Sequence, residues 1–328
     1  MNRLLRAICL TALLPAIALA ADQSVPAVKP DPSDMLLAAP THMDRVGRIV
    51  VPVSINGKGP FRFLVDTGAD GSLVSARLVH ALGLAPSQVP NEQVQGTTGL
   101  EQLPCVTIAS LRIGSIVKHD VRMPVSSSPV MSGLDGILGM AGFGAVRVVV
   151  DFHRNRVLID RTSRGLPEDF LDIHARRTSG GLLVIPALVG NVPVAAVIDT
   201  GATESLGNAA LRQALLRQAA KDATQARIYG VTRQISNGGL SHSPTVIMGP
   251  AAIRNLGIVY SDIPIFRIWH LDSQPALIIG MNALGVVDAL VLDYPRARVY
   301  LRPVTPAGLS VGVEDVFLPN GTTSDSGP

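Results

Sequence analysis

Two segments of the chain recur in the same order at nearly the same spacing. The stretch IVVPVSINGKGPFRFLVDTGADGSLVS at 49–75 is matched by LVIPALVGNVPVAAVIDTGATESLG at 183–207. A later block, DGILGM at 135–140, returns as ALIIGM at 276–281. Repeats in matched order indicate one duplicated structural unit. The sequence therefore predicts two lobes of similar fold.

The rest of the chain is divided by composition. The residues before the first repeat are rich in proline and lack a hydrophobic period, which is typical of a tether, and the end of the chain is similar. In order, we predict a signal peptide (1–20), a proline-rich lead-in (21–42), an N-terminal lobe (43–160), a linker (161–177), a C-terminal lobe (178–303) and a disordered tail (304–328).

The first 20 residues have the layout of a secretory signal peptide. Arg3 and Arg6 precede an apolar stretch, and small residues at Ala18 and Ala20 mark a cleavage site. We expect an exported protein, either periplasmic or secreted, with no stable membrane span once the signal is removed. An uncleaved membrane anchor is the alternative, although the apolar run is short for a span. Cleavage leaves Cys105 as the remaining cysteine, which excludes an intrachain disulfide.

Composition favours a mostly β fold. Hydrophobic residues make up 47% of the chain and charged residues 16%, which excludes disorder of the whole chain. The 31 glycines and 24 prolines, with 4% aromatics, suggest many short strands joined by tight turns. Strands are expected at 49–53 and 61–65, and a short helix ending at Gly83 follows them. An ordinary β-sandwich without an active site would share these patterns.

Charge and motif content argue against several classes of partner. The formal net charge is +3, and about +1 remains after Arg3 and Arg6 are removed, so we expect no nucleic-acid partner. The seven histidines show no paired spacing, and Cys105 has no Cys or His close by in the sequence. We therefore expect no metal site and no cofactor. Phosphate-binding and dinucleotide-binding loops are also missing from the sequence.

The residues that carry chemistry are the two Asp-Thr-Gly-Ala segments. Each one follows a hydrophobic strand, where a carboxylate is costly to bury unless a partner satisfies it. Two copies in matching contexts are a specific signal, because a single triplet is expected roughly 0.1 times in a chain of this length. Two unrelated turns that cap strand ends are the alternative. The candidate catalytic residues are Asp66 and Asp199.

The sequence resembles the aspartic peptidases, specifically the retroviral-like and pepsin-like group. In that family the Asp-Thr-Gly motif supplies the catalytic aspartate, and a later pair of apolar residues followed by Gly139 or Gly280 packs beside it. The resemblance covers nearly all of both lobes. It implies two pseudo-symmetric, retropepsin-like β-barrel lobes, each with a short helix, in which Asp66 faces Asp199. We expect a monomer with an intrachain pseudo-dimer; pairing between chains remains open.

Electrostatic repulsion between the two carboxylates explains how such a pair can activate water. Two carboxylates about 4 Å apart repel by about 4 kcal/mol at an effective dielectric constant of about 20, so they share one proton over a wide pH range. The ionised member takes a proton from a bound water while the protonated member polarises the scissile carbonyl. The pair titrates as a unit, so neither aspartate is assigned one role.

The resemblance also implies supporting residues around the aspartates. Thr67 and Thr200 would lock the two loops together, and the N–H groups of Gly68 and Gly201 would hold the carboxylates. Ala69 and Ala202 stand where pepsin-like enzymes often carry a hydroxyl that favours the ionised aspartate. Alanine lacks that donor, so we expect an optimum at mildly acidic pH.

A second polar patch lies about 30 residues after each aspartate. In the family, a β-hairpin flap at this position closes over the substrate. The corresponding candidates are Gly96 and Thr97 in the first lobe, and Tyr229 and Gly230 in the second. Any surface hairpin would show the same pattern.

These observations favour an aspartic endopeptidase, a hydrolase that cleaves a peptide or protein substrate with water activated by a two-aspartate dyad at the lobe interface. The alternative is a non-catalytic periplasmic peptide-binding or scaffold module that retains the fold. Intact Asp66 and Asp199 argue against that alternative.

Overall fold

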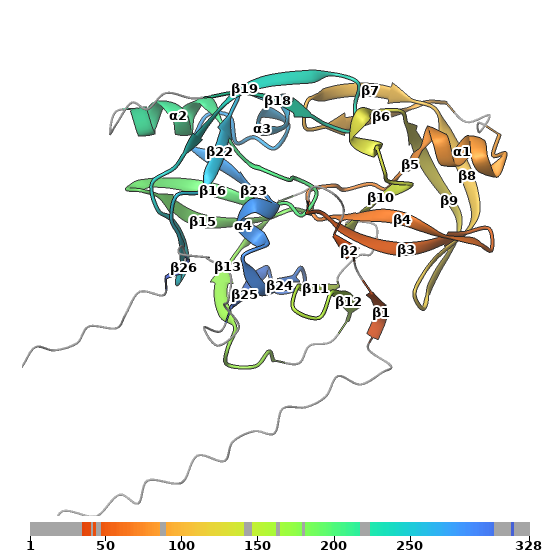
Figure 1. The fold of residues 1–328 in the computed structure, drawn as a ribbon, viewed down its shortest axis with the longest axis horizontal. Helices are drawn as coiled ribbons and strands as arrows, with labels where there is room; N and C mark the ends of the chain where they lie inside the picture. The colour runs from red at the N-terminus through yellow and green to blue at the C-terminus, as the bar shows by residue number, and fades with distance from the viewer. Residues whose placement is uncertain are drawn as a thin grey trace, which may run out of the picture.

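The computed structural model describes residues 35–40, 42–43, 47–85, 90–140, 146–161, 165–178, 181–216, 224–304 and 316–317. The predicted signal peptide lies outside the described residues, as do most of the predicted tail and residues 21–34 of the lead-in. The prediction of a mostly β fold with two lobes is confirmed (Figure 1). None of the helices in the described part of the chain is long and apolar enough to cross a membrane.

A closed barrel of six strands forms the first lobe. Its strands pair in a ring, and the pairing of the first with the last closes it. In ring order they are β3 (Ile49–Ile55), β4 (Lys58–Asp66), β10 (Gly136–Gly139), β5 (Leu73–Ser75), β9 (Ile116–Ser126) and β8 (Cys105–Ile113), with β2 (His42–Met43) added beside β3. Both β3 and β8 bury apolar side chains in the core, and the strand predicted at 49–53 is confirmed as part of β3.

Short elements complete this lobe. The helix α1 (Ala76–Leu82) begins after Ser75, whose hydroxyl accepts from the Leu78 N–H, and it ends at Gly83 in the left-handed conformation. The predicted stop at Gly83 is therefore confirmed. A separate two-stranded sheet is formed by β6 (Glu92–Gly96) and β7 (Gly99–Leu103), and a 3₁₀ turn, η1, spans Pro129–Met131.

The second lobe is built around an eleven-stranded sheet among the described residues. In path order its strands are β18 (Thr224–Tyr229), β19 (Ile235–His242), β22 (Gly257–Tyr260), β17 (Ser205–Gly207), β23 (Ala276–Ile279), β16 (Val192–Ile198), β15 (Leu183–Val189), β20 (Val246–Met248), β21 (Ala251–Ile253) and β26 (Val316–Phe317), with β14 (Arg176–Arg177) beside β15. Its helices are α2 (Ala209–Leu216), α3 (Pro264–Ile268) and α4 (Met281–Leu284).

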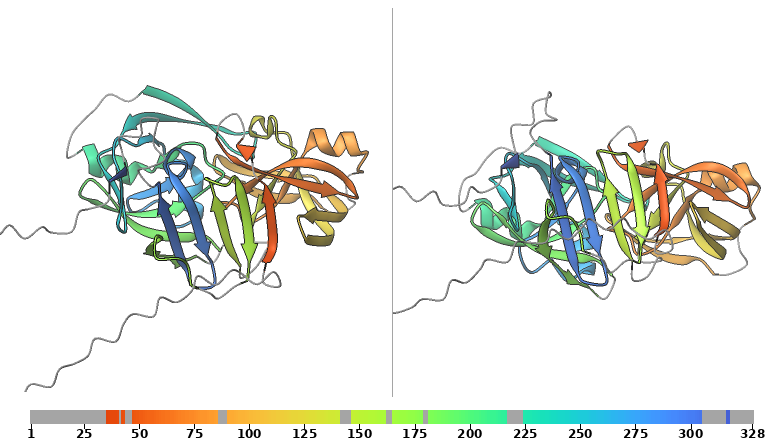
Figure 2. Two further views of the ribbon diagram at one scale, coloured as in Figure 1. Left: turned by 60° about the horizontal axis from the view of Figure 1, so that its bottom comes forward. Right: turned by 90° about the horizontal axis from the view of Figure 1, so that it is seen from below.

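A six-stranded sheet joins the lobes on the side shown in Figure 2. Its order is β1 (Met35–Pro40), β12 (Arg156–Asp160), β11 (Arg147–Asp151), β24 (Val287–Asp293), β25 (Arg298–Pro303) and β13 (Leu171–His174). The antiparallel pairing of β11 with β24 crosses the junction, and one apolar core runs through both lobes. Buried Arg147 contacts Asp293 at 2.8 Å beside this seam.

Two strands of this sheet differ from the sequence-based division. Residues 35–40 of the expected lead-in form β1 and pair with β12, and residues 171–174 of the expected linker form β13 and pair with β25. Both are outer strands held by backbone hydrogen bonds to a single neighbour, which requires little apolar pattern. The alternation of Leu171 and Ile173 with polar residues was a strand signal that the sequence division did not use.

Candidate active site

The two candidate aspartates stand at equivalent ends of buried strands. Asp66 is the last residue of β4, beside Gly139 of the parallel strand β10. Asp199 directly follows β16, and its N–H donates to the Ile279 carbonyl of the parallel strand β23 at 3.0 Å. Strand pairing therefore positions both loops, independently of the contacts that the loop residues themselves make.

Two threonines lock the loops to each other. The Thr67 hydroxyl donates to the Ile198 carbonyl at 3.0 Å and accepts from the Thr200 N–H at 3.0 Å. The Thr200 hydroxyl donates to the Val65 carbonyl at 2.7 Å and accepts from the Thr67 N–H at 3.2 Å. Both threonines are buried, so four hydrogen bonds shielded from water hold the loops in one relative position.

Each loop glycine lies against the aspartate of the other lobe. A Cβ on Gly68 would lie within 3.0 Å of the Asp199 carboxylate, and one on Gly201 would lie equally close to Asp66. The backbone N–H of Gly68 also donates to Asp66 at 2.9 Å, and that of Gly201 donates to Asp199 at 2.8 Å. Only glycine allows an approach this close at both positions.

The carboxyl groups of Asp66 and Asp199 are close enough to interact with each other across the junction of the lobes. Burial raises the pKa of both, since it penalises the charged form. The neighbouring negative charge of Asp199 raises the pKa of Asp66 further, whereas the Gly201 N–H opposes the rise at Asp199. A pair of this kind holds a shared proton above the pH at which an ordinary aspartic acid loses it.

Two serines that the sequence analysis did not single out support the same loops. Ser72 and Ser205 each stand six residues after an aspartate. The Ser72 hydroxyl accepts from the Gly139 N–H at 3.2 Å, and the Ser205 hydroxyl accepts from the Gly280 N–H at 3.1 Å. Their equal spacing in the repeat was a signal that could have identified them.

The two predicted hairpins are present, and their tips meet. Gly96 ends β6 and Thr97 lies in the turn to β7, while Tyr229 ends β18 and Gly230 follows it. The Thr98 and Thr232 hydroxyls lie 3.0 Å apart between the tips. Both hairpins lie on the side of the molecule opposite the six-stranded sheet (Figure 1).

The four predicted hairpin residues occupy different settings. Gly96 lies against the second tip and Gly230 against Thr98. Thr97 is half-buried in the turn beside them, whereas Tyr229 is 44% exposed. Gly96 and Gly230 therefore each lie where one tip contacts the other, whereas the Tyr229 side chain is exposed to solvent.

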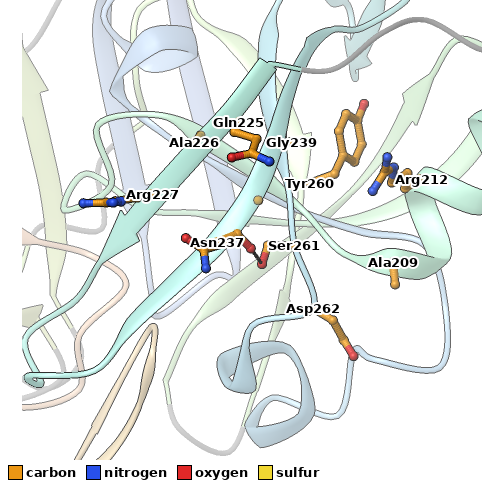
Figure 3. Close-up of a pocket in the computed structure, with 11 residues that line it drawn as sticks. Ala209, Arg212, Gln225, Ala226, Arg227, Asn237, Gly239, Tyr260, Ser261 and Asp262 are labelled. Carbon is orange, nitrogen blue, oxygen red and sulfur yellow. Dashed lines mark hydrogen bonds between the residues drawn. The ribbon is translucent and has the colours of Figure 1, made fainter.

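A surface groove of about 900 Å³ lies on the second lobe, away from the aspartates. None of its lining residues belongs to the Asp-Thr-Gly loops. Figure 3 shows Arg227 and Arg212 at its two ends. The lining consists of Ala209, Arg212, Gln225, Ala226, Arg227, Asn237, Gly238, Gly239, Tyr260, Ser261 and Asp262.

The residues that the structure describes do not form a metal-binding site. No group of three or more His, Cys, Asp or Glu side chains comes together among them. Cys105 is buried as a free thiol.

Comparison with known proteins identifies each repeat separately. A family model described as aspartyl protease matches the chain twice, over residues 51–141 and 185–283. The first match contains Asp66 and the second contains Asp199. A search of curated protein sequences gives no match to the chain.

Proposed function

The chain belongs to the aspartyl protease family, and from that premise we propose that it is an endopeptidase whose Asp66–Asp199 pair activates water. The observation that carries the proposal is the close approach of each loop glycine to the opposite carboxylate, which places the two buried aspartates side by side. This arrangement supports one proton shared between two acids, the state that acid–base hydrolysis requires.

The proposed reaction needs only these two groups and a water molecule. The ionised carboxylate takes a proton from water, and the water oxygen bonds to the scissile carbonyl carbon. At the same time the protonated carboxyl donates its proton to the carbonyl oxygen. A tetrahedral diol results. The dyad then returns one proton to the amide nitrogen and takes one from a diol hydroxyl. The C–N bond breaks to leave an acid and an amine, with no covalent enzyme intermediate.

Burial of the dyad supports activity at mildly acidic pH, although backbone N–H groups oppose its effect on the pKa of each aspartate. The Ala202 N–H donates to Asp199 at 3.3 Å, and the Ala69 N–H lowers the pKa of Asp66. Alanine side chains at 69 and 202 offer no further donor to the ionised form, so burial keeps the pKa of both aspartates raised.

The proposal also covers the substrate, the oligomeric state and the location of the protein. We propose that it acts on peptide or protein substrates as a monomer, because the lobes already share a continuous core and a joining sheet. The signal-like N-terminus supports a periplasmic or secreted location.

The test is cleavage of a diverse peptide mixture between about pH 3 and about pH 7 by wild type, Asp66→Asn and Asp199→Asn. Loss of cleavage in both variants is expected. The matched control is Asp70→Asn, the same substitution on an exposed residue of the first loop, which should keep activity. Activity retained by either dyad variant would contradict the two-aspartate mechanism. No cleavage by folded wild type would contradict the proposal and favour a peptide-binding module.

A further inference from the structure

The two hairpins are attached to their lobes in different ways. In the second hairpin, residues 224–242, Gly239 and Leu240 pair with β18 on one side and with β22 on the other. In the first hairpin, residues 92–103, β7 pairs with β6 alone, and Pro104 separates it from β8. Proline has no N–H to donate to a neighbouring strand. The second hairpin is therefore part of a larger sheet, whereas the first is a separate one.

The tip of the second hairpin is also fastened to the first lobe. The Ser128 hydroxyl donates to the Gly230 carbonyl at 2.5 Å, and the Ser126 hydroxyl donates to the Val231 carbonyl at 2.7 Å. Both serines are buried where β9 leads into η1. Hydrogen bonds that water does not reach are costly to break without replacement.

An apolar contact adds to these two hydrogen bonds. Val231 of the second tip packs against a buried cluster of the first lobe, as do Val130 and, from the stem of the first hairpin, Val94. That cluster consists of Val50, Leu64, Leu73, Leu103, Met131, Leu134 and Ile137. Withdrawal of the second tip would expose this surface to water, which opposes the movement.

The equivalent positions in the second lobe do not fasten the first hairpin in this way. Strand register aligns Ser126 with Ser261 and Ser128 with Ile263, since Val125 and Tyr260 occupy matching places beside β5 and β17. The Ser261 hydroxyl donates within its own lobe, to the Asn237 carbonyl at 2.7 Å. Ile263 has no hydroxyl and is buried in apolar core.

The stem of the first hairpin joins the same apolar cluster through Val94 and Leu103, whereas its tip is held mainly by contacts with the second tip. Thr98 meets Thr232, and the Arg233 N–H donates to Glu101 at 2.8 Å. The Arg233 guanidinium also pairs with Glu101, and its side chain is 75% exposed. The Glu101 side chain is 13% exposed, so the pair is open to solvent on its arginine side, and a pair with one partner so exposed contributes less to stability than a buried pair. The first tip can therefore separate at lower cost than the second.

We propose that Ser126 and Ser128 are positioning residues that hold the second hairpin in place, so that peptide substrates enter by displacement of the first hairpin alone. The inference rests on the proposed peptidase function only for its kinetic consequences. In this arrangement the second hairpin is a fixed wall of the substrate site, and the first hairpin is the lid.

Hydrogen exchange of the intact protein tests the inference without any substrate. In wild type, backbone amides at 96–101 should exchange at least about tenfold faster than those at 230–234. The double variant Ser126→Ala/Ser128→Ala should raise exchange at 230–234 by about tenfold or more, because two hydrogen bonds to that tip are lost. Equal protection of the two tips, or no change in the variant, would overturn the inference.

Two controls separate the fastening from general loss of structure. Ser261→Ala removes the matching hydroxyl of the second lobe and should leave the exchange difference between the tips intact. Ser128→Thr retains a hydroxyl at the fastening position and should preserve protection at 230–234. Should the double variant fail to fold, Ser128→Ala alone gives the same comparison with one hydrogen bond removed.

Kinetics supply a second readout on a peptide that wild type cleaves. A loosened wall weakens substrate binding, so the double variant should raise KM by about tenfold with little change in kcat. A purely structural role would lower the active fraction, and hence kcat, at unchanged KM. If wild type cleaves no peptide, the proposed function fails, but the exchange experiment still decides the inference.

Discussion

The two lobes agree at the dyad and differ at the hairpins. Thr67 and Thr200 make reciprocal hydrogen bonds, and Ser72 and Ser205 accept equivalent N–H groups. In contrast, one hairpin is a separate sheet and the other is continuous with its lobe. Symmetry is thus kept where each lobe must present the same atoms to the other. Elsewhere the duplicated unit has diverged, and by our proposal this lets one hairpin move while the other is held.

The largest predicted effect tests the symmetric part. Gly68→Ala and Gly201→Ala should each lower kcat/KM by about 10³-fold, about 4 kcal/mol, because the new Cβ displaces the opposite carboxylate. Peptide cleavage assays would measure both. Because the two lobes are symmetric at the dyad, the two losses should be similar. A large effect at one glycine alone would contradict that symmetry. Gly71→Ala is the control, since a Cβ there meets nothing within 4 Å.

The joining sheet gives the next largest effect, on stability. Asp293→Ala should lower the free energy of unfolding by about 3 kcal/mol or more, since it leaves buried Arg147 without its partner at 2.8 Å. The first-lobe counterpart, Asp151→Ala, should cost less, about 1 kcal/mol, because Arg154 and Arg156 are 56% and 45% exposed and its third partner, Arg302, is 3.7 Å away. Urea unfolding measures both. Equal costs would show that the seam is symmetric in energy.

Much of the symmetric part could be predicted from the sequence. The repeat located both aspartates, and Asp-Thr-Gly identified the threonine and glycine neighbours through the resemblance. Ser72 and Ser205 were within reach of the same reasoning, since their spacing is equal. These residues act within a few positions of the motif, so local sequence carries their information.

The asymmetric part depends on contacts between distant segments. Ser126 meets Val231 across 105 positions and Ser128 meets Gly230 across 102, and neither serine belongs to a motif. The strand β13 was missed although Leu171 and Ile173 alternate with polar residues, and β1 was missed because it is held by backbone pairing to one neighbour. Backbone pairing of this kind leaves little trace in side-chain pattern.

The dyad also predicts a pH dependence of stability. Burial raises the pKa of Asp66 above the ordinary value of 3.8, so the folded state holds a proton that the unfolded chain has lost. The folded state therefore binds more protons, and stability falls as pH rises through the raised pKa. Asp66→Asn and Asp199→Asn should both flatten the decline in Tm as the pH rises above the ordinary pKa of 3.8. Asp70→Asn should keep the wild-type slope; a slope unchanged in the dyad variants would contradict the shared proton.

The smallest effect sharpens the contrast between the hairpins. The Arg233 N–H and guanidinium lower the pKa of Glu101, so the contact between the tips persists in mild acid and is lost as pH falls through that lowered pKa. Glu101→Gln removes the charge while keeping the shape of the side chain. It should raise hydrogen exchange at 96–101 by about two- to fivefold, as expected for loss of an exposed ion pair.

The same variant should leave 230–234 unchanged, because Ser126 and Ser128 hold the second tip independently of Glu101. Arg267→Gln is the matched control, since its exposed ion pair with Asp272 lies on α3 and its following loop, away from both tips. A rise at both tips in Glu101→Gln would mean that they open as one unit. A rise confined to the first tip would mean that the duplicated hairpins have taken separate roles, one as lid and one as wall.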